Sequence, residues 1–114
     1  MYKIYHNPRC SKSRQALQIL RENNIDPEII EYLKTPPTEA EIREILKILG
    51  KTPLEICRTK EKLFKELGLS RESSDDELIS AMAQNPKLIE RAIIIKNGEK
   101  GVLGRPPENV KELF

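Results

Sequence analysis

The sequence has few aromatic residues, and its positive and negative charges nearly balance. It contains three Tyr, two Phe and no Trp, so it offers no evident platform on which nucleic-acid bases could stack. Twenty Lys and Arg residues oppose 18 Asp and Glu residues, and a net charge of +2 argues against a dedicated nucleic-acid binder. No apolar run approaches the roughly 18–20 residues that span a bilayer. We therefore expect neither a nucleic-acid nor a membrane partner.

Cysteine and histidine are scarce as well. Two cysteines, Cys10 and Cys57, are too few for a disulfide framework, and adding the single His6 leaves too few ligands for a metal site. The first residues lack a basic segment followed by an apolar one, so we predict no signal peptide and a cytoplasmic protein. With 114 residues, 38% of them hydrophobic and 33% charged, the chain is expected to form one domain over residues 1–114.

The residues that are present predict a mixed α/β fold. A short strand is expected at residues 3–5, a helix from about Ser11 to the Asn23-Asn24 pair, and a second strand at residues 28–32. Strand, helix and strand within about 30 residues form a βαβ unit, which requires parallel strands and a right-handed crossover. The first third of the chain is therefore predicted to build the start of a sheet.

Helix start signals follow in the middle of the chain. Capping-box patterns begin at Thr38, Thr52 and Ser74, each with Glu three residues later. Gly50 suits the end of the first of these helices, and apolar spacing continues after the second box as far as Gly68. This part of the chain is predicted to be a helical block.

The last quarter of the chain predicts a hairpin and a closing helix. Residues 93–95 are three consecutive Ile, the strongest strand signal in the sequence, and Asn97-Gly98 is the preferred pair for a type I′ turn. Val102-Leu103 supplies the returning strand, and a helix carrying Val110 and Leu113 follows Pro106-Pro107. The predicted order is β-α-β, helices, then β-β-α.

Cys10 lies at the junction between the first strand and the first helix. A thiol at this place faces the free N–H groups and the positive end of the helix dipole, and both favour the nucleophilic thiolate. Lys12 and Arg14 add positive potential. The plainer interpretation is a buried structural cysteine, because free cysteines also behave as small apolar residues.

The spacing after Cys10 excludes two kinds of active-site loop. A phosphatase-type loop needs Arg six residues after the cysteine, and Ala16 stands there. A dithiol oxidoreductase needs a second cysteine three residues on, and Ser13 occupies that position. The motif is a one-thiol C-x-x-S site, which can form a mixed disulfide but has no neighbouring thiol to resolve it. We interpret Cys57 as a core residue.

Residues 5–14, YHNPRCSKSR, resemble the active-site loop of the ArsC-type, glutaredoxin-linked arsenate reductases, and the closest resemblance is to their short bacterial branch. The similarity covers nearly the whole chain, with further landmarks at residues 32–37, 66–69, 85–91 and 104–106. The family fold is thioredoxin-like with an inserted helical block, which agrees with the predicted element order.

The resemblance implies roles for four residues. Cys10 matches the family's nucleophile, and Arg58, Arg91 and Arg105 match the arginines that hold the oxyanion. Guanidinium groups remain charged, bind tetrahedral oxyanions bidentately, and would stabilise the thiolate and the charge that develops during attack. Glutathione is the implied co-substrate and glutaredoxin the implied protein partner, with no bound cofactor or metal.

Three residues around the cysteine are predicted to support it. Ser13 would contribute a hydroxyl contact and Arg14 positive charge. His6 could aid deprotonation of the thiol, or it could only order the loop; the sequence leaves both interpretations open.

Two other functions fit the same sequence. One is a glutathione-dependent thiol reductase with a different substrate. The other is a non-catalytic transcriptional regulator like the Spx proteins, which share the fold and bind RNA polymerase. Spx proteins usually carry C-x-x-C as a redox switch, so Ser13 argues against this function.

Ala92 departs from the family pattern. Family members usually have Arg-Pro where this chain has Arg91-Ala92. Because a cis bond is far less costly before proline than before other residues, we predict a trans Arg91–Ala92 bond. A slightly altered oxyanion pocket and weaker arsenate reduction would follow from a trans bond.

Overall fold

In the computed structural model, which describes residues 1–114, the chain folds as two units. Unit 1 joins Met1–Thr35 to Arg91–Phe114, and unit 2 is Pro36–Glu90. Unit 1 therefore contains the predicted β-α-β and β-β-α segments, and unit 2 is the predicted helical block. The division into units does not test whether residues 1–114 form one domain, which stays a prediction.

Unit 1 is built on a four-stranded sheet with the order β2-β1-β3-β4. The strands are β1 (Tyr2–His6), β2 (Glu28–Glu31), β3 (Ile93–Lys96) and β4 (Lys100–Leu103). Strand β1 pairs parallel with β2 and antiparallel with β3, and β3 pairs antiparallel with β4. The crossover from β1 to β2 contains α1 (Ser11–Glu22), so the predicted βαβ unit is confirmed.

The hairpin and the closing helix of unit 1 follow their turn residues. Asn97 and Gly98 both have positive φ, 53° and 67°, as a type I′ turn requires. The closing helix is a 3-10 helix, η2 (Pro107–Leu113). Its i→i+3 pattern includes the Asn109 N–H, which donates to the Pro106 carbonyl at 3.0 Å.

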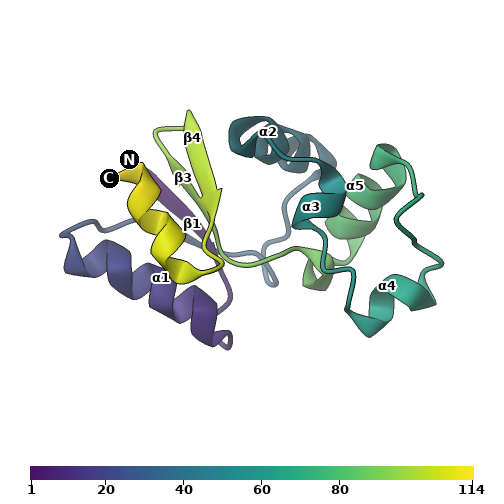
Figure 1. The fold of residues 1–114 in the computed structure, drawn as a ribbon, viewed down its shortest axis with the longest axis horizontal. Coiled ribbons are helices and arrows are strands. Elements are labelled where there is room, and N and C mark those ends of the chain that lie inside the picture. Colours follow the sequence, from purple (N-terminus) through teal and green to yellow (C-terminus); the bar gives the residue numbers. More distant parts are fainter. The chain divides into compact units, whose positions relative to one another are not determined.

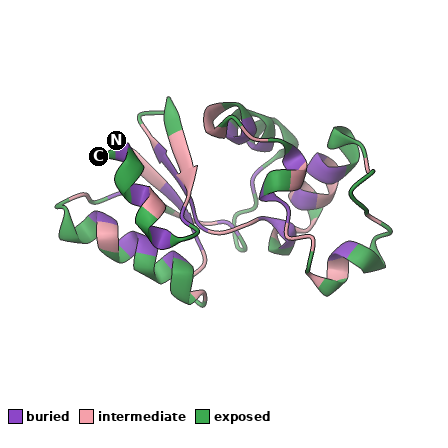
Figure 2. Ribbon diagram, viewed as in Figure 1, coloured by how far each residue is buried: buried purple, intermediate pink, exposed green.

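The core of unit 1 lies between the sheet and two helices. Apolar positions of α1 bury one face of that helix, and η2 lies beside α1 (Figure 1). The buried stripe is plain in Figure 2. The core residues are Ile4, Ala16, Leu17, Leu20, Ala92, Ile94, Val110 and Leu113. Their burial fixes the face of α1 that turns to the sheet, and with it the position of the residues at the start of the helix.

Unit 2 consists of short helices. They are α2 (Glu39–Leu49), α3 (Pro53–Ile56), α4 (Lys62–Glu66), α5 (Asp75–Gln84) and a 3-10 turn, η1 (Pro86–Leu88). All three predicted capping boxes are formed, at Thr38, Thr52 and Ser74. Gly50 ends α2 with φ of 65°, a left-handed conformation that glycine adopts without a steric penalty. None of the helices in either unit is both long and apolar enough to cross a membrane.

The apolar spacing after the second capping box does not form one helix. The chain leaves helical geometry between α3 and α4, where Cys57 forms an isolated antiparallel bridge with Ile89. The Arg58 N–H donates to the Leu88 carbonyl at 2.7 Å, and the Glu90 N–H donates to the Ile56 carbonyl at 2.8 Å. This pairing brings Arg58 beside the end of unit 2 at Glu90.

Candidate active site

The loop that presents Cys10 is closed by backbone hydrogen bonds. The Cys10 N–H donates to the Asn7 carbonyl at 3.0 Å, and the Arg14 N–H donates to the Cys10 carbonyl at 3.0 Å. Cys10 is the N-cap of α1, with extended backbone (φ −94°, ψ 123°), and no side chain caps the helix. The thiol is partly exposed. The thiol is therefore held at the start of α1, and its sulfur makes no capping hydrogen bond to the helix.

A buried polar group lies beneath this loop. Ser13 is fully buried and His6 is only 6% exposed. The Ser13 Oγ accepts the Asn7 N–H at 3.0 Å and lies 2.7 Å from His6 Nδ1. Because Oγ accepts the Asn7 N–H, its own hydrogen can be donated to Nδ1, which accepts when the imidazole is neutral. The predicted support by Ser13 thus has a concrete form, a link between the end of β1 and the first turn of α1.

The charge state of His6 follows from its burial. Burial lowers the pKa of His6 below its ordinary value of 6.5; the Glu31 carboxylate opposes this, and the Arg21 and Arg14 guanidinium groups reinforce it. A neutral His6 whose Nδ1 is engaged by Ser13 is well suited to ordering the loop. Of the two roles left open by the sequence, the geometry favours this one.

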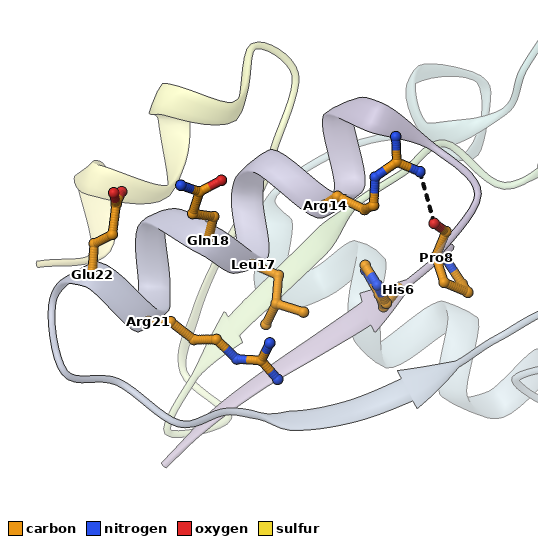
Figure 3. Close-up of a pocket in the computed structure, with 7 residues that line it drawn as sticks. All are labelled: His6, Pro8, Arg14, Leu17, Gln18, Arg21 and Glu22. Carbon is orange, nitrogen blue, oxygen red and sulfur yellow. Dashed lines mark hydrogen bonds between the residues drawn. The ribbon is translucent and has the colours of Figure 1, made fainter.

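Arg14 closes the loop from outside. Its Nη1 donates to the Pro8 carbonyl at 2.8 Å (Figure 3). The guanidinium thus lies beside the segment from Pro8 to Cys10 and ties it to α1. This hydrogen bond holds the loop, and the predicted role of Arg14 as a source of positive charge for the thiol stays a prediction.

Arg91 and Arg105 come from neighbouring segments of unit 1. The Gly104 N–H donates to the Ala92 carbonyl at 2.8 Å, which places the residues before β3 beside those after β4. A Cβ on Gly104 would lie 3.1 Å from the Ile94 Cδ1 and 3.2 Å from the Ala16 Cβ. This absence of a side chain lets the Arg105 segment approach α1, the helix that Cys10 begins.

Arg91 and Arg105 differ in burial. Arg105 is exposed, and the Asn109 amide donates to its carbonyl oxygen at 3.2 Å. Arg91 is partly buried, and its Nε is buried without a hydrogen-bond partner. A buried N–H donor without a partner is uncommon in proteins, so Arg91 retains an unused capacity to donate.

The prediction of a trans Arg91–Ala92 bond is wrong, because the bond is cis. The Arg105–Pro106 bond is cis as well. Ala92 is fully buried, and its carbonyl is held by Gly104. Tertiary contacts rather than the residue's own preference set the backbone at this position. The altered oxyanion pocket was expected only for a trans bond, so it is no longer expected.

Arg58 lies in unit 2 and is engaged by two carboxylates. Its Nη1 is 3.1 Å from Glu61 Oε2, and its Nε is 3.6 Å from Glu90 Oε1. The Lys87 ammonium also approaches Glu61, at 3.2 Å. Sequence reasoning missed this cluster, because Glu90 is distant in the chain. The oxyanion-binding role of Arg58 remains a prediction.

Cys57 is a core residue, as predicted. Its side chain is 5% exposed, and burial, together with the Glu90 carboxylate, raises the pKa of its thiol to about 11. At neutral pH it is therefore protonated and a poor nucleophile. The structure gathers no group of His, Cys, Asp and Glu side chains that could hold a metal ion.

A βαβ unit and a β-hairpin in one sheet, with a lone thiol at the start of the first helix, define a thioredoxin-like protein. The chain belongs to the ArsC family, whose model matches residues 5–113. It is 54% identical to the uncharacterized protein YfgD of Escherichia coli K12, over 97% of this chain and 94% of that protein. It is 47% identical to an arsenate reductase of Neisseria meningitidis, over 98% and 97%. The solved structure of an arsenate reductase from Vibrio cholerae matches with a TM-score of 0.94 at 46% identity, over 99% and 97%.

Proposed function

We propose that the protein is an arsenate reductase in which Cys10 is the nucleophile. The observation that carries this proposal is a partly exposed thiol at the uncapped start of α1 in an ArsC-family chain. Relatives from Neisseria meningitidis and Haemophilus influenzae that are 47% and 44% identical bear the name arsenate reductase. The thiolate form of a cysteine is the nucleophile, and it is the form that would attack arsenic.

The reaction proceeds in three steps that balance electrons. The Cys10 sulfur bonds to arsenic while one arsenate oxygen takes up protons and leaves as water. A glutathione thiolate then attacks the Cys10 sulfur, and the electron pair of the S–As bond stays on arsenic. Arsenate is thereby reduced by two electrons to arsenite, and the two thiols are oxidised to a mixed disulfide. A glutaredoxin thiolate attacks the glutathione sulfur and releases the Cys10 thiolate.

An external reductant is required because the chain supplies no resolving thiol. Ser13 occupies the position where a dithiol enzyme has its second cysteine, and its hydroxyl is used by His6 and Asn7. Cys57 is buried and protonated. Glutathione and glutaredoxin provide the two missing thiols in this proposal.

Arginine side chains would bind the oxyanion. Arg91 and Arg105 lie in unit 1 with Cys10, on segments joined through Ala92 and Gly104. Their guanidinium forks match pairs of arsenate oxygens and stabilise the charge that develops as the thiolate attacks. Arg58 would have to exchange Glu61 or Glu90 for arsenate before it contributes.

A coupled assay tests the proposal. Arsenite should form only when arsenate, glutathione and glutaredoxin are all present, and the Cys10→Ser variant should form none. Arsenite production without glutathione would contradict the external-thiol mechanism. No arsenite under any of these conditions would reject arsenate as the substrate.

The pairing of Arg58 with Glu61 and Glu90 favours one alternative. Carboxylates beside a cation weaken its attraction for an oxyanion, so the site could serve a glutathione-dependent reduction of another thiol substrate. Reduction of a glutathione mixed disulfide by the native chain, in the absence of arsenate turnover, would support this second function.

A further inference from the structure

A cavity of about 550 Å³ lies along α1, beside the residues that lead to Cys10. We call it the α1 cavity. Leu17 forms the middle of it, with Arg14 on one side and Arg21 on the other, as Figure 3 shows. Pro8 and His6 lie at one end, and Glu22 lies at the opposite end. Its volume falls within the range of about 300–1,000 Å³ that small-molecule sites occupy.

The α1 cavity borders the thiol loop without including the thiol. Pro8 and Arg14, which line it, stand on either side of Cys10 in the sequence and are joined by the 2.8 Å hydrogen bond. Cys10, Arg91 and Arg105 are not among the lining residues. A molecule in this cavity could therefore reach toward Cys10 without occupying the place of the oxyanion.

The charges of the α1 cavity are arranged along its length. Arg14 and Arg21 are seven residues apart on α1, so they share one face of the helix, about 10 Å apart along its axis. Both are exposed, as is Glu22, and none of the three forms a salt bridge. The cavity thus offers two separated guanidinium groups and, at its far end, one carboxylate.

We propose that the α1 cavity binds glutathione as the attacking thiol. The proposal rests on the function proposed above and adds the place from which the second thiol acts. Glutathione carries two carboxylates near its two ends and one ammonium beside one of them, which complements this pattern of charges. The γ-glutamyl carboxylate pairs with Arg21 and its ammonium with Glu22, while the glycine carboxylate pairs with Arg14.

The apolar and neutral residues of the α1 cavity suit this ligand. Leu17, 8% exposed, offers its side chain to the middle of the peptide, where no charge is present. His6 closes the end beside Pro8, and burial lowers its pKa, so it brings no added charge there at neutral pH. Cysteine is the central residue of glutathione, so it lies over Leu17 with its thiol turned toward the loop that holds Cys10.

Binding of S-methylglutathione tests the site without any redox chemistry. Its capped sulfur cannot attack, so titration calorimetry reports binding alone. We expect saturable binding to the native chain and at least tenfold weaker binding to Arg21→Ala. Lys111→Ala is the matched control, because it removes one exposed positive charge from unit 1 outside the cavity. It should bind as the native chain does.

A second comparison tests the place assigned to the ammonium. Glu22→Gln should weaken binding of S-methylglutathione several-fold. It should not weaken binding of the N-acetylated form, which has no ammonium to pair with Glu22. Equal losses with both ligands would overturn the assigned orientation.

The site and the proposed function fail in different ways. No binding of S-methylglutathione at millimolar concentration, or equal binding to the native chain and Arg21→Ala, would overturn the site even if arsenate is reduced. If binding depends on Arg21 but the coupled assay yields no arsenite, the arsenate reductase function is rejected. The glutathione site in the α1 cavity then still stands. If both stand, Arg21→Ala should raise the KM for glutathione about tenfold and leave the KM for arsenate unchanged.

Discussion

Cys10 and Cys57 show how one residue type takes two roles in this chain. Cys10 is partly exposed at the start of α1, where its sulfur is accessible. Cys57 is buried in unit 2, and its thiol has a pKa of about 11. The environment, rather than the side chain, separates the proposed nucleophile from the core residue.

We predict that Cys10→Ser abolishes arsenate reduction and that Cys57→Ser retains most of it. The reason is that the Cys10 sulfur is accessible, whereas Cys57 is buried and its thiol has a raised pKa. Initial rates of arsenite formation measure the difference, with thermal unfolding as the control for folding. A Cys57→Ser variant that is folded but inactive would contradict the one-thiol mechanism.

His6 is the only histidine, so its titration can be observed in the stability of the protein. Burial lowers its pKa in the folded state. As pH falls below about 6.5, the unfolded chain binds a proton at His6 before the folded chain does. We therefore predict that the free energy of unfolding decreases as pH is lowered from 7.5 to 5.5.

Urea unfolding of the native chain and of His6→Asn at these pH values measures this effect. Asn keeps a polar atom near the Nδ1 position and does not titrate. The variant should lose less stability over the same interval. An identical pH dependence in the two proteins would show that His6 is not its source.

At the scale of elements, unit 1 depends on close packing between α1 and the segment after β4. Gly104 makes this packing possible, because a Cβ there would meet Ile94 and Ala16 at 3.1–3.2 Å. The same contact holds the backbone before Arg105 against the helix that begins at Cys10. The packing of two elements thus positions two predicted site residues.

We predict that Gly104→Ala destabilises the protein by about 1–3 kcal/mol, the usual cost of an overpacked core. It should also lower arsenate turnover, because the segment carrying Arg105 must shift. Denaturant unfolding and the kcat/KM for arsenate measure the two effects. Native stability with native turnover would refute the importance of this contact.

The helices of unit 2 start with capping boxes that can be tested separately. The Thr38 and Ser74 hydroxyls each accept the backbone N–H of the Glu three residues later, at 3.1 Å. Thr38→Ala and Ser74→Ala should each lower the free energy of unfolding by about 1 kcal/mol. Glu44→Ala, an exposed change within α2, is the control. Losses no larger than that of the control would contradict the role of the caps.

At the scale of the whole molecule, the predicted site residues are divided between the two units. Cys10, Arg91 and Arg105 belong to unit 1, and Arg58 belongs to unit 2. Unit 1 is itself assembled from both ends of the chain. The chemistry assigned to the protein therefore depends on the folding of segments that are far apart in the sequence.

We predict that Arg91→Lys and Arg105→Lys each lower the kcat/KM for arsenate several-fold. Lysine keeps the charge but loses the planar fork that binds two oxygens at once. Lys111→Arg, an exposed change outside the site, should have no effect. Native kinetics in both lysine variants would exclude these arginines from oxyanion binding.

The sequence by itself determined most of the element order. The capping boxes, the Asn97-Gly98 turn and the βαβ pattern act through residues only a few positions apart, so they can be recognised without the fold. The C-x-x-S motif at the start of a helix, with Cys10 as the candidate nucleophile, is equally local. The family resemblance added the three arginines.

Only the tertiary structure decided how the site residues are engaged. The cis Arg91–Ala92 bond, the pairing of Arg58 with Glu90 and the arrangement of the α1 cavity depend on contacts between segments distant in the sequence. The bridge between Cys57 and Ile89, at the break between α3 and α4, also joins residues that are distant in the sequence. Local patterns specify which elements form, whereas packing between them determines which side chains meet.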